Sequence, residues 1–100
     1  MIVVARIKVQ SGREAEAEAA FRRLIDHVTR EEPGTLEYRM NRSRKDPTVF
    51  VFVERYENPA AFDRHGKSAA MQELFRTLQP VLDGAPVIDV LDEIAAKPAG

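Results

Sequence analysis

The chain has 100 residues, of which 44% are hydrophobic and 31% are charged, as expected for one globular domain. Fifteen basic and sixteen acidic residues give a net charge of −1, which excludes a field strong enough to attract nucleic acid or an anionic membrane. Because cysteine is absent, disulfides, thiolate metal sites and cysteine nucleophiles are excluded, and the composition suits a reducing cytoplasm. No run approaches the ~20 apolar residues of a membrane span, so we expect a soluble protein.

The N-terminal third predicts a strand followed by a long helix. Residues 2–9 alternate in the manner of a strand. Ser11 and Glu14 have the spacing of a capping box, which predicts a helix that begins there and runs to about Arg30. The segment Glu32-Pro33-Gly34 ends this helix. The two glutamates before the proline are unfavourable at a helix C-terminus, and nothing in the sequence explains them.

Residues 48–57 contain the strongest strand signal of the chain. Valines alternate with aromatic and polar residues, so the two sets point to opposite faces, and both faces are largely apolar. A strand that is apolar on both faces needs a cover on each. Residues 35–43 predict a neighbouring strand with Leu36, Tyr38 and Met40 directed inward, and a polar hairpin connection joins the two strands.

The last forty residues predict a broken helical region and a fourth strand. Asn58 caps a short helix that begins at a proline and stops near Gly66. Ser68 can cap a second helix with apolar residues at helical spacing. Residues 87–94 are expected to form a strand, and residues 95–100 a loose tail.

The order of these elements is β-α-β-β-α-β, with the second helical region broken in two, which is the ferredoxin-like pattern of an α+β fold. It predicts a four-stranded antiparallel sheet within one domain, residues 1–94, with the helices on one face. Since the helices cover that face only, we expect a second copy of the chain to pack sheet to sheet in a symmetric homodimer.

Several segments resemble the antibiotic biosynthesis monooxygenase (ABM) family: S-G-R-E, E-E-P-G-T-L-E-Y, D-P-T-V-F-V-F-V-E-R-Y and N-P-A-A-F-D-R-H. The resemblance spans residues 2–91 and implies an ABM-like domain with the dimeric α/β-barrel fold and a pocket between each sheet and its own helices. It also implies oxidation of a phenolic or quinol-like aromatic substrate by oxygen. Such enzymes need neither metal nor flavin, because an electron-rich phenolate can itself pass an electron to oxygen.

Metal and haem chemistry are not expected. The resemblance places Phe75 where haem-degrading relatives have an iron-ligating histidine, and the chain contains no tryptophan. Two histidines on different helices, without clustered carboxylates, predict no metal site, and the resemblance implies that no cofactor is needed. His27 is instead expected to form a surface pair with Asp26 or Glu31.

His65 is the leading catalytic candidate. It follows Phe62 by three residues on the short helix, so the two share a face, and an inward Phe62 would bring His65 to the rim of a cavity. Because histidine titrates near neutral pH, it could accept a phenol proton or hydrogen-bond a bound oxygen. The alternative is a partly exposed histidine that favours the helix C-terminus.

The next candidates are Tyr56 and Glu54, which lie on the aromatic face of the strand predicted at residues 48–57. As site residues, Tyr56 would be a second catalytic hydrogen-bonding group and Glu54 a substrate-binding carboxylate. As structural residues, Tyr56 would be a core aromatic, and Glu54 would pair with Arg6, Arg39 or Arg55 across the strands.

A further set of apolar residues would either bind a flat aromatic ring or form plain core: Leu24, Tyr38, Phe52, Phe62, Met71 and Phe75. The first functional hypothesis is therefore a cofactor-independent ABM-type monooxygenase. The alternatives are a non-catalytic dimeric module that binds small molecules, and an isomerase or other proton-transfer enzyme on a small polar metabolite. A filled cavity would favour the first alternative, and arginines converging inside it would favour the second.

Overall fold

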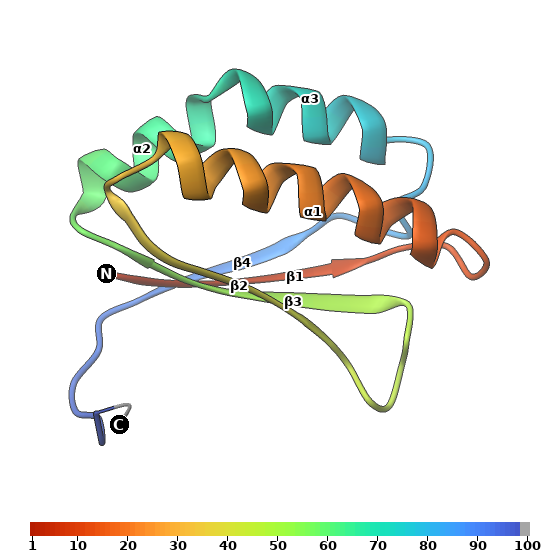
Figure 1. Cartoon of the computed structure of the whole chain (residues 1–100). Helices are drawn as coiled ribbons and strands as arrows, with labels where there is room; N and C mark the ends of the chain where they lie inside the picture. The colour runs from red at the N-terminus through yellow and green to blue at the C-terminus, as the bar shows by residue number, and fades with distance from the viewer. Residues whose placement is uncertain (99–100) are drawn as a thin grey trace.

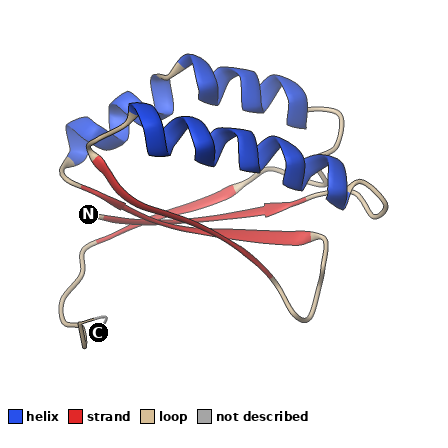
Figure 2. Cartoon of the chain, in the orientation of Figure 1, coloured by secondary structure: helices blue, strands red, loops and turns tan. Residues whose placement is uncertain are grey.

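A four-stranded antiparallel sheet and three helices make up the part of the chain that the computed structural model describes, residues 1–98. All three helices lie on one face of the sheet (Figures 1 and 2). The elements are β1 (Ile2–Lys8), α1 (Glu14–Glu31), β2 (Thr35–Arg42), β3 (Val49–Tyr56), α2 (Pro59–Lys67), α3 (Ala69–Leu78) and β4 (Val87–Leu91). The strand order β2-β3-β1-β4 places β3 and β1 in the centre, and the predicted ferredoxin-like α+β fold is confirmed.

The predicted break in the second helical region lies at Ser68. Asn58 caps α2, where its Oδ1 accepts from the Ala61 N–H at 2.9 Å. The Ser68 hydroxyl accepts from the Met71 N–H at 3.2 Å and donates to the His65 carbonyl oxygen at 2.8 Å. Ser68 therefore caps the start of α3 and binds the end of α2 at once, which fixes the C-terminal turn of α2 that carries His65.

The predicted capping box of α1 is wrong. The helix begins at Glu14 with Arg13 as its N-cap, and no side chain caps it. Gly12, with a φ of +91°, turns the chain in the left-handed conformation and leaves Ser11 outside the helix start. Arg13 instead pairs with Glu16, at 2.9 Å between Nε and Oε1.

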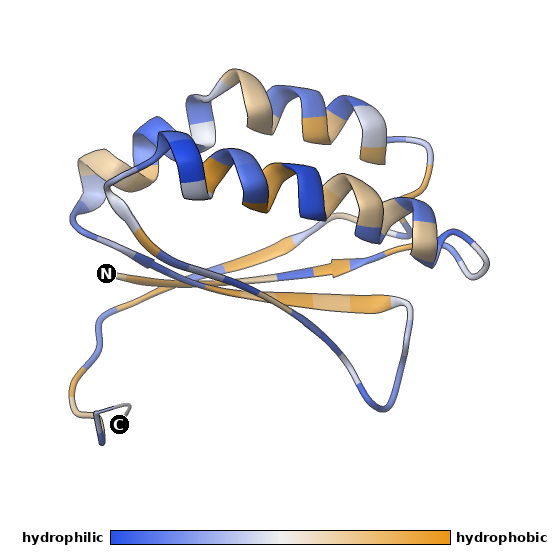
Figure 3. Cartoon of the chain, viewed as in Figure 1, coloured by the Kyte–Doolittle hydropathy of each residue, from blue (hydrophilic) through white to orange (hydrophobic). Residues whose placement is uncertain are grey.

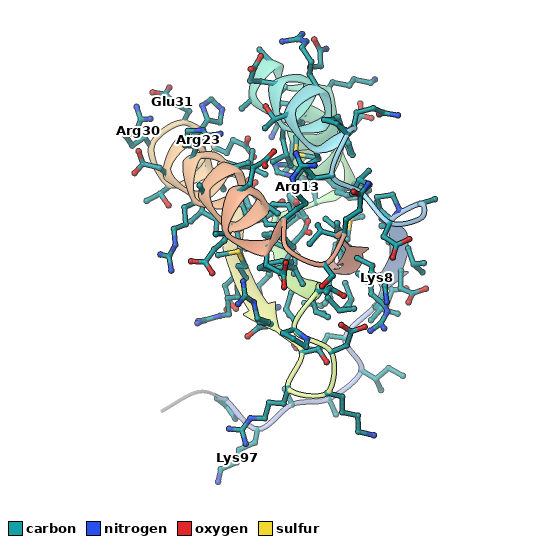
Figure 4. The ribbon with its side chains drawn as sticks, turned by 90° about the vertical axis from the view of Figure 1, so that its right-hand side faces the viewer. Lys8, Arg13, Arg23, Arg30, Glu31 and Lys97 are labelled. Atoms are coloured by element: carbon teal, nitrogen blue, oxygen red, sulfur yellow. The ribbon has the colours of Figure 1, made fainter. Side chains whose placement is uncertain are left out.

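Aromatic rings join α1 to the inner face of the sheet. The centroid of the Phe21 ring lies 5.2 Å from that of Phe50 and 4.9 Å from that of Phe52, and all three side chains are fully buried. Such tilted and edge-to-face pairs add stability beyond their buried area. The charged side of α1 faces outward, and Figure 4 shows Arg30 and Glu31 at its exposed end.

The inward direction predicted for Leu36 is wrong. The pairing of β2 with β3 shifts register between Thr35 and Glu37, so a bulge leaves residue 36 without a partner on β3. Leu36 is consequently 55% exposed. Beyond the bulge, Tyr38 and Met40 do pack against the core.

No helix within residues 1–98 lies over the outer face of the sheet, and β3 is hydrophobic over much of its length (Figure 3). Residues opposite one another in an antiparallel pair share a face. The registers of β1 with β3 and β4 therefore gather one apolar set on the outer face: Ile2, Val4, Val51, Val53, Val87 and Leu91. Within it, Val53 is 37% and Leu91 46% exposed.

β4 is shorter than predicted and ends at Leu91 instead of Ile94. Leu91 pairs with Ile2, the first residue of β1, so β1 offers no further partner beyond it. Of the predicted tail, residues 95–98 carry no helix or strand, and residues 99–100 lie outside the described part. None of the helices within residues 1–98 is long and apolar enough to cross a bilayer.

Candidate functional site

A cavity of about 160 Å³ lies between the sheet and the helices. Its wall is almost entirely apolar, and its polar side chains are Tyr38, Glu54 and His65. Seven of the nine residues predicted for the site contribute to the wall: Tyr38, Phe52, Glu54, Phe62, His65, Met71 and Phe75. Phe75 stands at the mouth, where 41% of it is exposed. The cavity also touches residues that the sequence analysis did not single out: Val3, Ala5, Ile7, Phe21, Gly66, Leu74, Pro86 and Ile88.

Leu24 and Tyr56 do not line this cavity. Leu24 is buried between α1 and α3, where it borders a separate crevice with Ala20 and Leu74. Tyr56 is 1% exposed and directs its hydroxyl to Glu54, at 2.5 Å from Oε1. Tyr56 can therefore act on a molecule in the cavity only through Glu54.

His65 is buried, contrary to the expected position at a rim, with 3% of its surface exposed. Its Nδ1 lies 2.7 Å from Oε1 of Glu32, at the end of α1. The rings of Tyr38 and Tyr56 flank it, with centroids 5.0 Å and 5.6 Å away. A buried imidazole bonded to a carboxylate is held in one orientation, which is what a proton acceptor in an apolar cavity requires.

Glu32 is the functional candidate that the sequence analysis missed. Its Oε1 also accepts from the Thr35 hydroxyl at 2.9 Å, and its Oε2 lies 3.7 Å from the Nε2 of His27. The partner predicted for His27 is therefore wrong: Asp26 pairs with Arg30, and His27 faces Glu32. The sequence did contain a signal for Glu32, since two glutamates at a helix C-terminus are unfavourable without another role. In the structure Glu32 turns inward from that position, while Glu31 stays exposed.

The arginine partner predicted for Glu54 is also wrong. Glu54 lies on the inner face of β3, whereas Arg39 and Arg55 lie on the outer face and pair with Glu37. The pKa of the Glu54 carboxyl is raised to about 7, mainly because the group is buried. The hydrogen bond from Tyr56 lowers this pKa, and the negative charge of Glu32 raises it further. Burial also raises the pKa of the Tyr38 and Tyr56 hydroxyls, so both remain protonated at neutral pH.

The arrangement offers acid–base chemistry beside an apolar cavity. His65 is placed to take a proton, and Glu54 and Tyr38 can donate or accept hydrogen bonds. Within residues 1–98 no three His, Asp or Glu side chains gather in a way that could hold a metal ion.

Solved structures resemble this chain over most of its length. A candidate antibiotic biosynthesis monooxygenase from Caulobacter crescentus CB15 is 35% identical, with a TM-score of 0.90 over 94% of this chain and 89% of that one. A protein from Shewanella oneidensis is 31% identical, with a TM-score of 0.79 over 88% and 84% of the two chains. A protein from Pseudomonas aeruginosa is 26% identical, with a TM-score of 0.84 over 94% and 93%.

No curated protein matches the chain. The family model described as antibiotic biosynthesis monooxygenase matches residues 1–77, which include the whole of β1 to α2 and most of α3. The chain therefore belongs to the antibiotic biosynthesis monooxygenase family.

Proposed function

We propose that this protein is a monooxygenase that oxidises a phenolic or quinol-like substrate without metal or flavin, with His65 as the proton acceptor. Family membership supports the class of reaction. In monooxygenation a phenol and O₂ give a quinone and water, with one oxygen atom inserted into the ring. A quinol and O₂ give a quinone and hydrogen peroxide, which is an oxidase reaction that inserts no oxygen atom but begins with the same step. Either reaction begins when the hydroxyl loses its proton, because the phenolate is the better electron donor to oxygen.

The observation that carries the proposal is the position of His65. This side chain is buried, lines the apolar cavity and is bonded through Nδ1 to Glu32. Its Nε2 is therefore the nitrogen left to accept a proton from a substrate hydroxyl. The apolar wall excludes water, which strengthens this transfer and protects a reduced oxygen species from side reactions.

The size of the cavity supports a substrate with a single aromatic ring. The cavity measures about 160 Å³, close to the ~150 Å³ apolar cavity that accepts benzene in another protein. Phe52, Phe62 and Met71 would contact the ring, and Tyr38 or Glu54 would bond a second oxygen on it. A substrate of three or four fused rings would require Phe75 and Met71 to move.

A homodimer formed through the outer face of the sheet is part of the same proposal. Ile2, Val4, Val51 and Val53 form an apolar centre on that face, and none of the helices within residues 1–98 covers it. An apolar sheet face of this kind is stable when it packs against another. The lack of cysteine supports a location in the reducing cytoplasm.

The alternative of an isomerase on a small polar metabolite has less support. Polar metabolites, phosphorylated ones above all, are bound by converging cationic side chains. The residues that line the cavity include no arginine or lysine. The non-catalytic binding module remains an outcome of the test below.

The test is oxygen uptake by the purified, metal-stripped protein with a panel of single-ring and fused-ring phenols and quinols. We expect turnover with single-ring phenols and quinols, and little with fused-ring compounds. His65→Ala should slow turnover by ~10²-fold, as for the loss of a general base. Asp63→Ala, on the exposed side of the same helix, is the matched control and should change nothing.

Binding of a redox-inert single-ring phenol, followed by calorimetry, separates catalysis from binding. Binding without any oxygen uptake over the whole panel would identify a binding module and overturn the proposed function. Turnover that persists undiminished in His65→Ala would leave the reaction class standing and overturn the role of His65.

A further inference from the structure

His65 is shared by two cavities of different character. On one side is the apolar cavity of the proposed substrate, and on the other a cavity of about 270 Å³ near the end of α1 whose lining residues are mainly polar or charged. Besides His65, the polar residues that line the second cavity are His27, Glu31, Glu32, Thr35, Arg64 and Ser68. Glu32 lines this second cavity and does not line the apolar one, so it contacts the imidazole from behind and would not touch a substrate on the other side.

The carboxylate of Glu32 is held more tightly than a surface ion pair. Its Oε1 lies 2.7 Å from His65 Nδ1 and accepts from the Thr35 hydroxyl at 2.9 Å. Its backbone N–H donates to the Val28 carbonyl oxygen at 3.1 Å, so the residue ends α1 in a fixed position. Two bonds to one oxygen leave the carboxylate little freedom to rotate.

The other carboxylate oxygen indicates a purpose beyond stability. Oε2 of Glu32 is buried and has no hydrogen-bond partner among residues 1–98, with His27 Nε2 at 3.7 Å. A buried acceptor left without a partner costs about 1–3 kcal/mol. An ion pair selected for stability alone would satisfy both oxygens, whereas unsatisfied buried groups concentrate at functional sites.

We propose that Glu32 is the positioning residue of His65. It keeps the hydrogen of the neutral imidazole on Nδ1, leaves Nε2 free as the acceptor, and stabilises the imidazolium that forms when a substrate hydroxyl loses its proton. An ionised carboxylate can only accept hydrogen bonds, so His65 must donate the hydrogen of Nδ1 to Glu32. The same logic governs carboxylate–histidine pairs in hydrolytic enzymes and in metal sites. This inference rests on the proposed function for its catalytic consequence.

The test begins with the wild-type protein and needs no substrate. Long-range ¹H–¹⁵N spectra distinguish the two nitrogens of the His65 ring, and we expect the hydrogen on Nδ1. Glu32→Gln should lose this preference, because an amide can both donate and accept. Glu31→Gln, the exposed neighbour, is the matched control and should leave the His65 signals unchanged.

Turnover provides the second readout. Glu32→Gln should lower kcat with a single-ring quinol by about 10- to 100-fold while KM changes less than about two-fold, since the residue acts on the base and not on the ligand. Glu32→Asp, which restores the carboxylate, should recover part of the lost kcat. Glu31→Gln should match the wild type in both constants.

The two proposals fail separately. A hydrogen on Nε2 in the wild type, or His65 signals that ignore Glu32→Gln, would overturn the positioning role even if quinols are oxidised. A tautomer that depends on Glu32 in a protein without turnover would retain the positioning role and reject the monooxygenase function.

Discussion

Gly34 and Ala61 approach each other so closely that a Cβ placed on Gly34 would lie 2.8 Å from the Cβ of Ala61. The same atom would lie 3.2 Å from Nη2 of Arg64. The Gly34 carbonyl oxygen also accepts from the Glu57 N–H at 2.9 Å, which draws the start of α2 towards the start of β2. This close packing of α2 against the turn between α1 and β2 is what brings His65 within bonding distance of Glu32.

Gly34→Ala should therefore be destabilising out of proportion to one methyl group. The new Cβ meets Ala61 in a buried region, and overpacking of this kind costs about 1–3 kcal/mol. Urea denaturation should show a lower midpoint, and the His65 ring signals should shift as α2 moves outward. Gly66→Ala is the control, because a Cβ there meets no atom within 4 Å. It should be neutral or stabilising by up to ~1 kcal/mol, since Gly66 is inside a helix. An equal loss in both variants would contradict the close-packing account.

Glu54→Gln should change how stability depends on pH. Burial raises the pKa of Glu54 to about 7 in the folded chain, above its ordinary value of 4.5. The folded state then binds the proton more tightly than the unfolded state. The stability that this group contributes is present below about pH 4.5 and is lost as the pH rises through about 7. The glutamine keeps the bond from Tyr56 and has no charge to bury.

The measurement is the free energy of unfolding of wild type and Glu54→Gln at several pH values from about 5 to 8. As the pH rises, the free energy of unfolding of the variant should increase relative to that of the wild type, by about 3 kcal/mol in all. Glu57→Gln, an exposed neighbour, should follow the wild-type curve. A constant difference between Glu54→Gln and wild type across this range would show that Glu54 is not a buried, titrating group.

Val51→Asp and Phe52→Asp separate the two faces of β3. Val51 lies on the outer face, so an aspartate there should leave the monomer folded and abolish the proposed homodimer. Phe52 is buried against Phe21 and Tyr38, so the same change should prevent folding. Circular dichroism reports folding, and sedimentation reports mass. A wild type that is monomeric at micromolar concentration would refute the dimer.

Phe75→Ala should affect ligand binding more than stability. Phe75 is 41% exposed at the mouth of the cavity, so truncation removes less buried area than it would at a fully buried position. We expect the Kd of a single-ring phenol to rise several-fold with a loss of stability of about 1–2 kcal/mol. Leu78→Ala, fully buried in the same helix, should show the opposite pattern with a loss of about 2–5 kcal/mol. An unchanged Kd in Phe75→Ala would show that Phe75 does not contact the ligand at the entrance of the cavity.

Local patterns predicted much of this structure because they depend on residues close together in the chain. Alternation over 48–57 identified β3 and its aromatic face, and Asn58 and Ser68 marked the starts of α2 and α3. The bulge at Leu36 escaped prediction, since alternation alone does not tell which residue loses its partner.

The candidate site also combines features that the sequence predicts with features that it does not. By itself, the sequence determined the order of the elements, the two-faced central strand and the histidine on the short helix, because each follows from the period of a strand or helix and from capping chemistry. Only the tertiary structure decided that Glu32 binds His65 from 33 residues away, and that Glu54 bonds Tyr56 in place of an arginine. The pairing of His65 with Glu32 depends on how closely α2 can pack against Gly34, and the pairing of Glu54 with Tyr56 depends on which face of β3 the helices bury. No local period carries that information.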